Sequence, residues 1–127
     1  MVKCVHIVCR NKDESGWGCK HLRSLKGEVE PGWWETGRWL FSDQEADSLK
    51  GGLIFLHHIK NTPAHFAGLV DDWHEIITDE FTIRERKVFK VKYIKKLRST
   101  RWGLASHDRA WRSEIYEWTK KIPTSAD

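Results

Sequence analysis

The sequence is poor in cysteine, proline and methionine, and it has no long apolar run. It holds three cysteines, an odd number without a CxxC spacing, so neither a disulfide framework nor a zinc knuckle is indicated. On one strand Cys4 and Cys9 would point to opposite faces, and we expect Cys4, Cys9 and Cys19 to be ordinary thiols. No apolar stretch approaches the ~20 residues that span a bilayer, and residues 1–10 lack the apolar core and cleavage site of a signal peptide. These absences predict a soluble, cytoplasmic protein with no membrane partner.

The common catalytic signatures are missing as well. There is no P-loop, no G-x-S-x-G elbow, no H-E-x-x-H pair and no zinc-deaminase motif. A zinc site built from His57, His65 and His107 lacks the spacing of a ligand motif, so we expect no metal and no cofactor. A Cys–His or Lys–Glu pair assembled by the fold stays open as a catalytic alternative. The sequence favours a binding protein over an enzyme.

Two features exceed average usage, namely tryptophan content and the basic charge of the second half. The 127 residues predict one domain and include eight tryptophans, with a net charge of +4. Residues 84–121 hold thirteen lysines and arginines against four acidic residues. A basic half with interleaved aromatic residues is typical of nucleic-acid binders. The alternative is a solvated basic face without a partner.

The chain's most distinctive stretch is residues 51–70, which read as two strands and a turn. Gly51 and Gly52 lead into the apolar run 53–56, and the turn formers of residues 61–63 separate it from a second apolar run. Polar side chains gather where the hairpin leaves the core: His57, His58, Lys60 and His65. A strand that ends in such side chains is a common support for a binding site.

The remaining elements follow from local patterns. We expect a strand over 2–10, a short helix over 19–25, an extended aromatic segment over 33–41, a helix capped by Ser42 and Glu45, and a strand over 86–97. Residues 109–121 fit a strand or a helix, because Trp111, Ile115 and Trp118 also form a helical stripe, and we favour a strand near 113–118. Within the aromatic segment, alternation places Trp33 and Trp39 on one side and Trp34 on the other. Strands with few helices predict an α+β fold, a small mixed β-barrel with short flanking helices.

The hairpin also carries a resemblance to a known superfamily. Gly52–His57, Pro63 and Ala67–Val70, with the strand Val88–Leu97, resemble the PUA-like domains of the EVE, YTH and ASCH types over residues 37–97. The resemblance implies a pseudobarrel that binds nucleic acid, DNA or RNA, and one that can hold a flipped or modified base in an aromatic pocket. The ASCH group implies the alternative, a small hydrolase or nuclease acting on nucleic acid or modified nucleosides.

The candidate site residues follow from the needs of an unstacked base. Such a base needs aromatic faces, worth ~1–3 kcal/mol each, polar atoms to read its edge and cations for the neighbouring phosphates. The candidates for base or ligand binding are Trp17, Trp33, Trp39, His57, Trp102, His107 and Trp111. The candidates for phosphate binding are Lys60, Arg101, Arg109 and Arg112. For each tryptophan the competing interpretation is a place in the core, and for each histidine it is a satisfied rim position.

Overall fold

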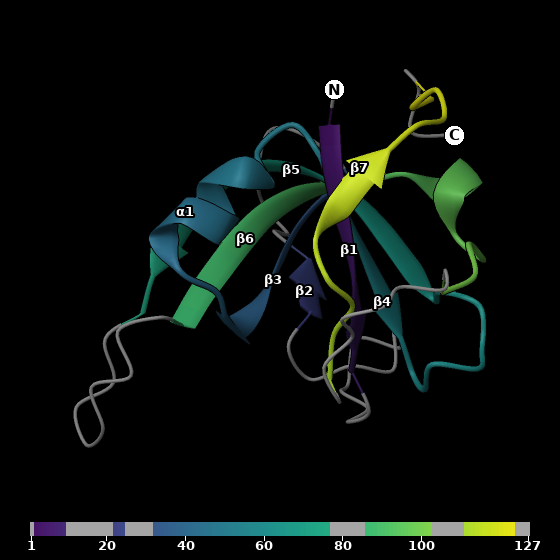
Figure 1. Cartoon of the computed structure of the whole chain (residues 1–127), viewed down its shortest axis with the longest axis horizontal. Helices are drawn as coiled ribbons and strands as arrows, with labels where there is room; N and C mark the ends of the chain where they lie inside the picture. Colours follow the sequence, from purple (N-terminus) through teal and green to yellow (C-terminus); the bar gives the residue numbers. More distant parts are fainter. Residues whose placement is uncertain (1, 10–21, 25–31, 77–85, 103–110, 124–127) are drawn as a thin grey trace.

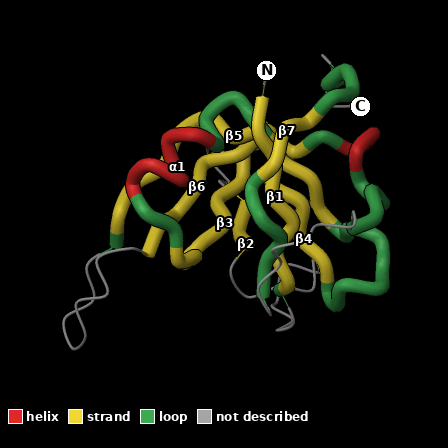
Figure 2. Tube along the Cα trace, in the orientation of Figure 1, coloured by secondary structure: helices red, strands yellow, loops and turns green. Residues whose placement is uncertain are grey.

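The computed structural model describes residues 2–9, 22–24, 32–76, 86–102 and 111–123, and within them the chain is mostly strand. Figures 1 and 2 show one twisted sheet, with α1 on the side of β6 and the 3-10 helix η1 on the side of β4. The elements are β1 (Val2–Val8), β2 (Leu22–Ser24), β3 (Trp33–Leu40), α1 (Asp43–Ser48), β4 (Leu53–His57), β5 (Phe66–Glu75), β6 (Arg86–Tyr93), η1 (Lys95–Leu97) and β7 (Tyr116–Trp118).

The strands form one open mixed sheet in the order β2-β3-β6-β5-β4-β1-β7. Every pairing is antiparallel except β1 with β4, which is parallel. The expected α+β fold, a small mixed β-barrel with short flanking helices, is therefore wrong. The last strand, β7, pairs with β1 and not with β2, so two edges stay open, and α1 is the only α-helix in the described ranges.

Apolar side chains cover both faces of the sheet. One cluster is centred on Val5, Ile7, Leu56 and Phe89 and is covered by α1 through Ala46 and Leu49. A smaller cluster on the other face is centred on Cys4, Leu53, Phe55 and Trp118. Because side chains alternate along a strand, β1 gives Val5 and Ile7 to the first face and Cys4 and His6 to the second. This second face carries the candidate site.

The expected hairpin is present as β4 and β5, with Leu53 opposite Leu69 and Leu56 opposite Phe66. Gly51 has a φ of +76°, a conformation that glycine adopts without strain. At Gly52, a Cβ atom would collide with the carbonyl oxygen of Lys3 in β1. The two glycines therefore let the chain turn out of α1 and let β4 lie directly against β1.

The predicted capping box of α1 is confirmed. The Ser42 hydroxyl accepts a hydrogen bond from the Glu45 amide at 3.1 Å, and the Glu45 carboxylate accepts one from the Ser42 amide at 3.0 Å. In β6, Phe89 and Val91 are buried, as their alternation with Lys90 and Lys92 predicts.

The aromatic segment is a strand, but its tryptophans do not alternate as expected. The pairing of β3 with β6 shifts between Gly37 and Trp39. Such a β-bulge inserts one residue into the strand and so changes which face the following side chains occupy. Trp34 and Trp39 consequently pack against the same apolar cluster, and the prediction that placed them on opposite sides is wrong.

Two further expectations need correction. Leu22–Ser24 pair with Trp34–Thr36 as a strand, not as part of a helix, and residues 19–21 lie outside the described ranges.

Cys4 is a free thiol, but Cys9 is disulfide-bonded, so the expectation of three ordinary thiols is wrong. The strand-face argument bore only on joint metal ligation by Cys4 and Cys9. Disulfides persist mainly in oxidising compartments, and the cytoplasmic location stays a prediction. None of the helices in the described ranges is long and apolar enough to cross a membrane.

Candidate functional site

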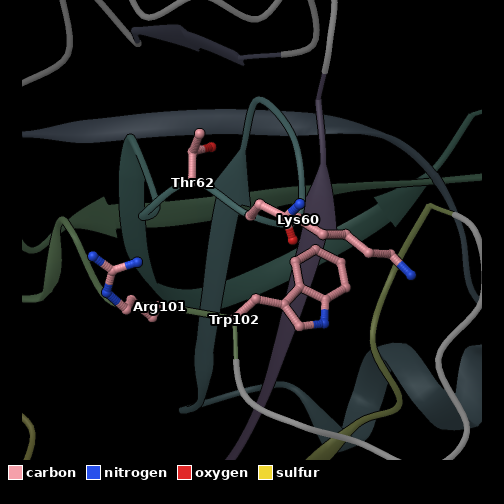
Figure 3. Close-up of a pocket in the computed structure, with 5 residues that line it drawn as sticks. Lys60, Thr62, Arg101 and Trp102 are labelled. Carbon is pink, nitrogen blue, oxygen red and sulfur yellow. The ribbon is translucent and has the colours of Figure 1, made fainter.

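Three of the predicted site residues meet at one pocket beyond the end of β4. Lys60, Arg101 and Trp102, together with Asn61 and Thr62, line a hollow of about 220 Å³. Figure 3 shows the Lys60 side chain extending alongside the indole of Trp102, with Thr62 and Arg101 on the other side of the pocket. Two segments far apart in sequence therefore contribute a large aromatic ring and two cations to one place.

Backbone hydrogen bonds join these two segments. The Ala64 amide donates to the Thr100 carbonyl at 2.9 Å, and the Ser99 amide donates to the Ala64 carbonyl at 2.9 Å. Ser99 takes a positive φ of 79°, which turns the chain after η1 back towards the hairpin. Trp102 is thereby brought next to the turn that follows β4.

Two buried histidines lie behind Trp102. The His57 ring is 5.1 Å from the Trp102 ring in an edge-to-face arrangement, and the His6 ring is 5.5 Å from it. The Lys60 ammonium lies 5.2 Å from the centre of the Trp102 ring, within the range of a cation–π contact. The indole thus rests on the histidine pair and contacts a lysine at the pocket.

The histidines belong to a chain of hydrogen bonds that crosses three adjacent strands. His57 Nδ1 is 2.8 Å from the Thr62 carbonyl oxygen, and His57 Nε2 is 2.7 Å from His6 Nδ1. His6 Nε2 is 2.7 Å from the Tyr116 hydroxyl. All four ring nitrogens are therefore used within the protein.

Burial keeps both rings neutral at pH 7. It lowers the pKa of His6 to about 3, with the neighbouring His57 adding to the effect, and it also lowers the pKa of His57. A neutral imidazole has one N–H donor and one acceptor nitrogen. Since a carbonyl oxygen can only accept, His57 must donate from Nδ1 to Thr62.

The remaining donors follow from this one assignment. His57 Nε2 is then an acceptor, so His6 donates to it from Nδ1. His6 Nε2 is in turn an acceptor, so the Tyr116 hydroxyl donates to it. The chain therefore has one direction, from Tyr116 through His6 and His57 to the Thr62 carbonyl.

This arrangement argues against direct catalysis by the histidine pair. His6 is 1% exposed and His57 is 0% exposed, and neither has a ring nitrogen left for a ligand. The nearby Cys4 thiol is no nucleophile at neutral pH, because burial raises its pKa to about 11 although a hydrogen bond with Tyr116 lowers it in part. The predicted ligand residue His57 thus supports the pocket from behind and does not line it.

The other predicted tryptophans in the described ranges lie elsewhere. Trp39 is 8% exposed and stacks on Trp111 at 6.2 Å, inside the cluster under α1. Trp33 is half-buried at the start of β3, with the Lys90 ammonium 4.8 Å from its ring. None of these three lines the pocket with Trp102, because the bulge in β3 and the packing of α1 hold them on another part of the sheet.

Arg112, predicted to bind phosphate, is engaged inside the protein. Arg112 is 3% exposed, and its guanidinium lies 2.8 Å from the Glu45 carboxylate, stacked over Phe41 and Trp111. A second hollow of about 480 Å³ borders this ion pair, but two acidic and two basic residues line it, so it favours neither anionic nor cationic ligands. Trp17, His107 and Arg109 lie outside the described ranges.

Sequence reasoning missed His6, Asn61, Thr62 and Tyr116. The turn residues had a signal, because Asn61 and Thr62 directly precede Pro63 between two strands. His6 and Tyr116 had none, because their place depends on β1 pairing in parallel with β4 and on β7 pairing with β1.

Comparisons with known proteins add no relative. No protein-family model matches the chain, and neither the search of curated proteins nor that of solved structures found a similar protein. The resemblance to PUA-like domains therefore stays a prediction.

Proposed function

We propose that the protein binds single-stranded nucleic acid, DNA or RNA, at the pocket of Lys60, Asn61, Thr62, Arg101 and Trp102. One base stacks on Trp102, and Lys60 and Arg101 contact the phosphates on either side of it. The observation that carries the proposal is the convergence of one tryptophan and two cations from distant segments on a single pocket.

Magnitudes favour a base over the lysine as the partner of Trp102. A cation–π contact at an exposed site contributes about 0.5–1 kcal/mol, whereas base stacking on an aromatic side chain contributes about 1–3 kcal/mol. A base can therefore replace the Lys60 ammonium, which lies 5.2 Å from the ring. The displaced ammonium remains within reach of the adjoining phosphate, where counterion release adds to affinity.

The pocket suits one base stacked on one side. His6 and His57 already pack against Trp102, and no second tryptophan lines the pocket among the described residues. Because every base has a π-face, one-sided stacking tolerates different sequences. The net charge of +4 favours association with a polyanion. We therefore expect weak sequence preference and strong salt dependence.

The first test is binding of fluorescein-labelled oligo(dT) and oligo(U), measured by anisotropy at several salt concentrations. Trp102→Ala is expected to weaken binding about 5- to 150-fold, the equivalent of one lost stack. Lys60→Ala and Arg101→Ala are each expected to weaken binding and to lower the slope of log K against log salt by about one.

The matched control is Lys90→Ala. It removes the same charge and the same kind of lysine–tryptophan contact, but from Trp33, on a part of the sheet that contributes nothing to the pocket. Affinity close to that of the unchanged protein is expected. Equal losses for Lys60→Ala and Lys90→Ala, or no binding to either oligonucleotide at low salt, would show that the pocket is not a nucleic-acid site.

A further inference from the structure

The hydrogen-bond chain through His6 and His57 ends at a residue of the pocket. It starts at Tyr116 in the edge strand β7, crosses β1 and β4, and leaves the sheet at the Thr62 carbonyl. Thr62 lines the pocket, and the same histidine rings lie behind Trp102. One buried chain therefore contacts both the turn and the aromatic platform of the proposed site.

The turn has few apolar contacts of its own to fix its shape. Ile59 is 48% exposed, and Asn61 and Pro63 are exposed as well. The Thr62 amide and hydroxyl both donate to the Ile59 carbonyl, so these two hydrogen bonds stay within the turn and do not connect it to the sheet. The Thr62 carbonyl makes the contact to the buried end of β4.

We propose that His57 is a positioning residue, which holds the pocket in its binding shape before the ligand arrives. The inference rests on the proposed function. The Nδ1–H of His57 fixes the Thr62 carbonyl, and with it the placement of Lys60 and Asn61 in the same turn. The ring of His57 supports Trp102 from behind. A preformed pocket binds more tightly, because the ligand need not order the turn.

His6 and Tyr116 serve this role through the tautomer of His57. The nitrogen that carries the proton in an imidazole is set by the hydrogen bond that the other nitrogen makes. Tyr116 donates to Nε2 of His6, so Nδ1 of His6 carries the proton and donates to Nε2 of His57. Nδ1 of His57 then carries its proton and donates to the Thr62 carbonyl. By donating to His6, the hydroxyl of Tyr116 in β7 therefore supports the tautomer of His57 in which Nδ1 carries the proton that faces the turn.

Two substitutions at one position separate the two hydrogen bonds of His57. The amide nitrogen of asparagine is bonded to Cγ, like Nδ1 of histidine, so His57→Asn keeps a donor for the Thr62 carbonyl. The amide of glutamine is one bond longer, like Nε2, so His57→Gln can reach His6 but leaves Thr62 without its donor. His57→Asn loses the buried hydrogen bond to His6, and His57→Gln loses the part-buried one to Thr62, so the larger loss of stability to urea is expected for His57→Asn.

Affinity for oligo(dT) is expected to separate the two variants in the order opposite to their stabilities. Both variants lose the ring behind Trp102, so both should bind more weakly than the unchanged protein, but His57→Gln should bind about three- to tenfold more weakly than His57→Asn, as expected for ordering one or two flexible side chains on binding. The slope of log K against log salt should be unchanged in both, because no phosphate contact is removed. Tyr116→Phe, at the half-buried outer end of the chain, should weaken binding in the same direction.

Hydrogen exchange of the Thr62 amide gives a measurement without ligand. Exchange is expected to be faster in His57→Gln than in His57→Asn, because only the former releases the turn. Equal exchange and equal affinity in the two variants would overturn the positioning role of His57.

If the unchanged protein binds no oligonucleotide while exchange still separates the variants, the proposed function fails and the positioning of the turn stands. If both variants at position 57 unfold, Tyr116→Phe provides the test instead. Thr62 exchange and oligo(dT) affinity equal to those of the unchanged protein would then contradict the inference.

Discussion

Arg112 and Glu45 form an ion pair that ties the segment after residue 110 to α1. The guanidinium of Arg112 is almost fully buried, and it also donates to the Ser113 carbonyl at 3.0 Å. Removing one partner of such a pair costs more than the pair contributes, because the other charge stays buried. Arg112 therefore depends on Glu45 for its place over Phe41 and Trp111.

Glu45→Gln is expected to lower the free energy of unfolding by about 1.5–3 kcal/mol, the range for a lost hydrogen bond to a charged group. Glutamine retains an oxygen for the Ser42 amide, so the capping box is conserved and the effect reports on Arg112. The measurement is urea denaturation. Glu117→Gln is the control, since it removes an exposed pair with Lys3 and should cost less than ~1 kcal/mol. Equal losses of stability in Glu45→Gln and Glu117→Gln would mean that Arg112 finds another partner.

At the scale of elements, the junction between α1 and β4 is specified by two adjacent glycines for two different reasons. Gly51 needs its positive φ, and open space surrounds the position of a Cβ there. Gly52 instead needs the absence of a side chain, because the Lys3 carbonyl in β1 occupies that position. The first glycine shapes the turn, and the second permits the parallel pairing of β1 with β4.

The two glycines should consequently respond differently to alanine. Gly51→Ala is expected to cost about 1–2 kcal/mol, the strain of a left-handed residue with a Cβ. Gly52→Ala is expected to reach or exceed the ~1–3 kcal/mol of an overpacked core, because backbone atoms must move apart. Thermal unfolding of both variants measures which substitution causes the larger loss of stability. A smaller loss at Gly52 would contradict the close approach of β1 to β4.

At the scale of the molecule, buried neutral histidines link folding to pH. Burial lowers the pKa of His6 to about 3 and that of His65 to about 4, and it lowers the pKa of His57 as well. In the unfolded chain each titrates near ~6.5. The unfolded chain therefore binds more protons than the folded protein below that value. The stability from neutral histidines is complete above pH 6.5 and is lost as the pH falls towards the folded values.

We expect the free energy of unfolding to decrease between pH 7 and pH 5, with a slope of up to about 1.4 kcal/mol per pH unit for each such histidine. Urea denaturation at several pH values measures it. His6→Phe, which keeps an aromatic ring next to Phe55, should reduce the slope. A stability that does not change across this interval would show that the histidines titrate equally in both states.

Local patterns in the sequence predicted local structure well. The capping box of Ser42 and Glu45, the hairpin of residues 53–70 and the alternation of Phe89 and Val91 each depend on neighbours in the chain, and each is confirmed. The single-domain prediction remains untested.

The features that the sequence could not supply depend on distant partners. Closure of the sheet depends on where β7 pairs, and the faces of Trp34 and Trp39 depend on a bulge opposite β6. The residues of the candidate site also fall into those that local sequence predicts and those that depend on distant partners. Lys60, Arg101 and Trp102 were predicted from residue type, whereas His6 and Tyr116 needed the pairing of the strands.

The parallel pairing of β1 with β4 also bears on the order in which the protein folds. The contacts of β4 with β5 and of β5 with β6 join consecutive strands, but His6 meets His57 across 51 residues and Tyr116 across 110 residues. Contacts between residues far apart in sequence form slowly, because a long loop must close before they contribute. A folding intermediate that holds only β4, β5 and β6 would already carry Lys60 and Thr62 while lacking the histidine chain behind them. The proposed binding of oligonucleotides should therefore be acquired in the last kinetic phase of folding, when β1 and β7 dock.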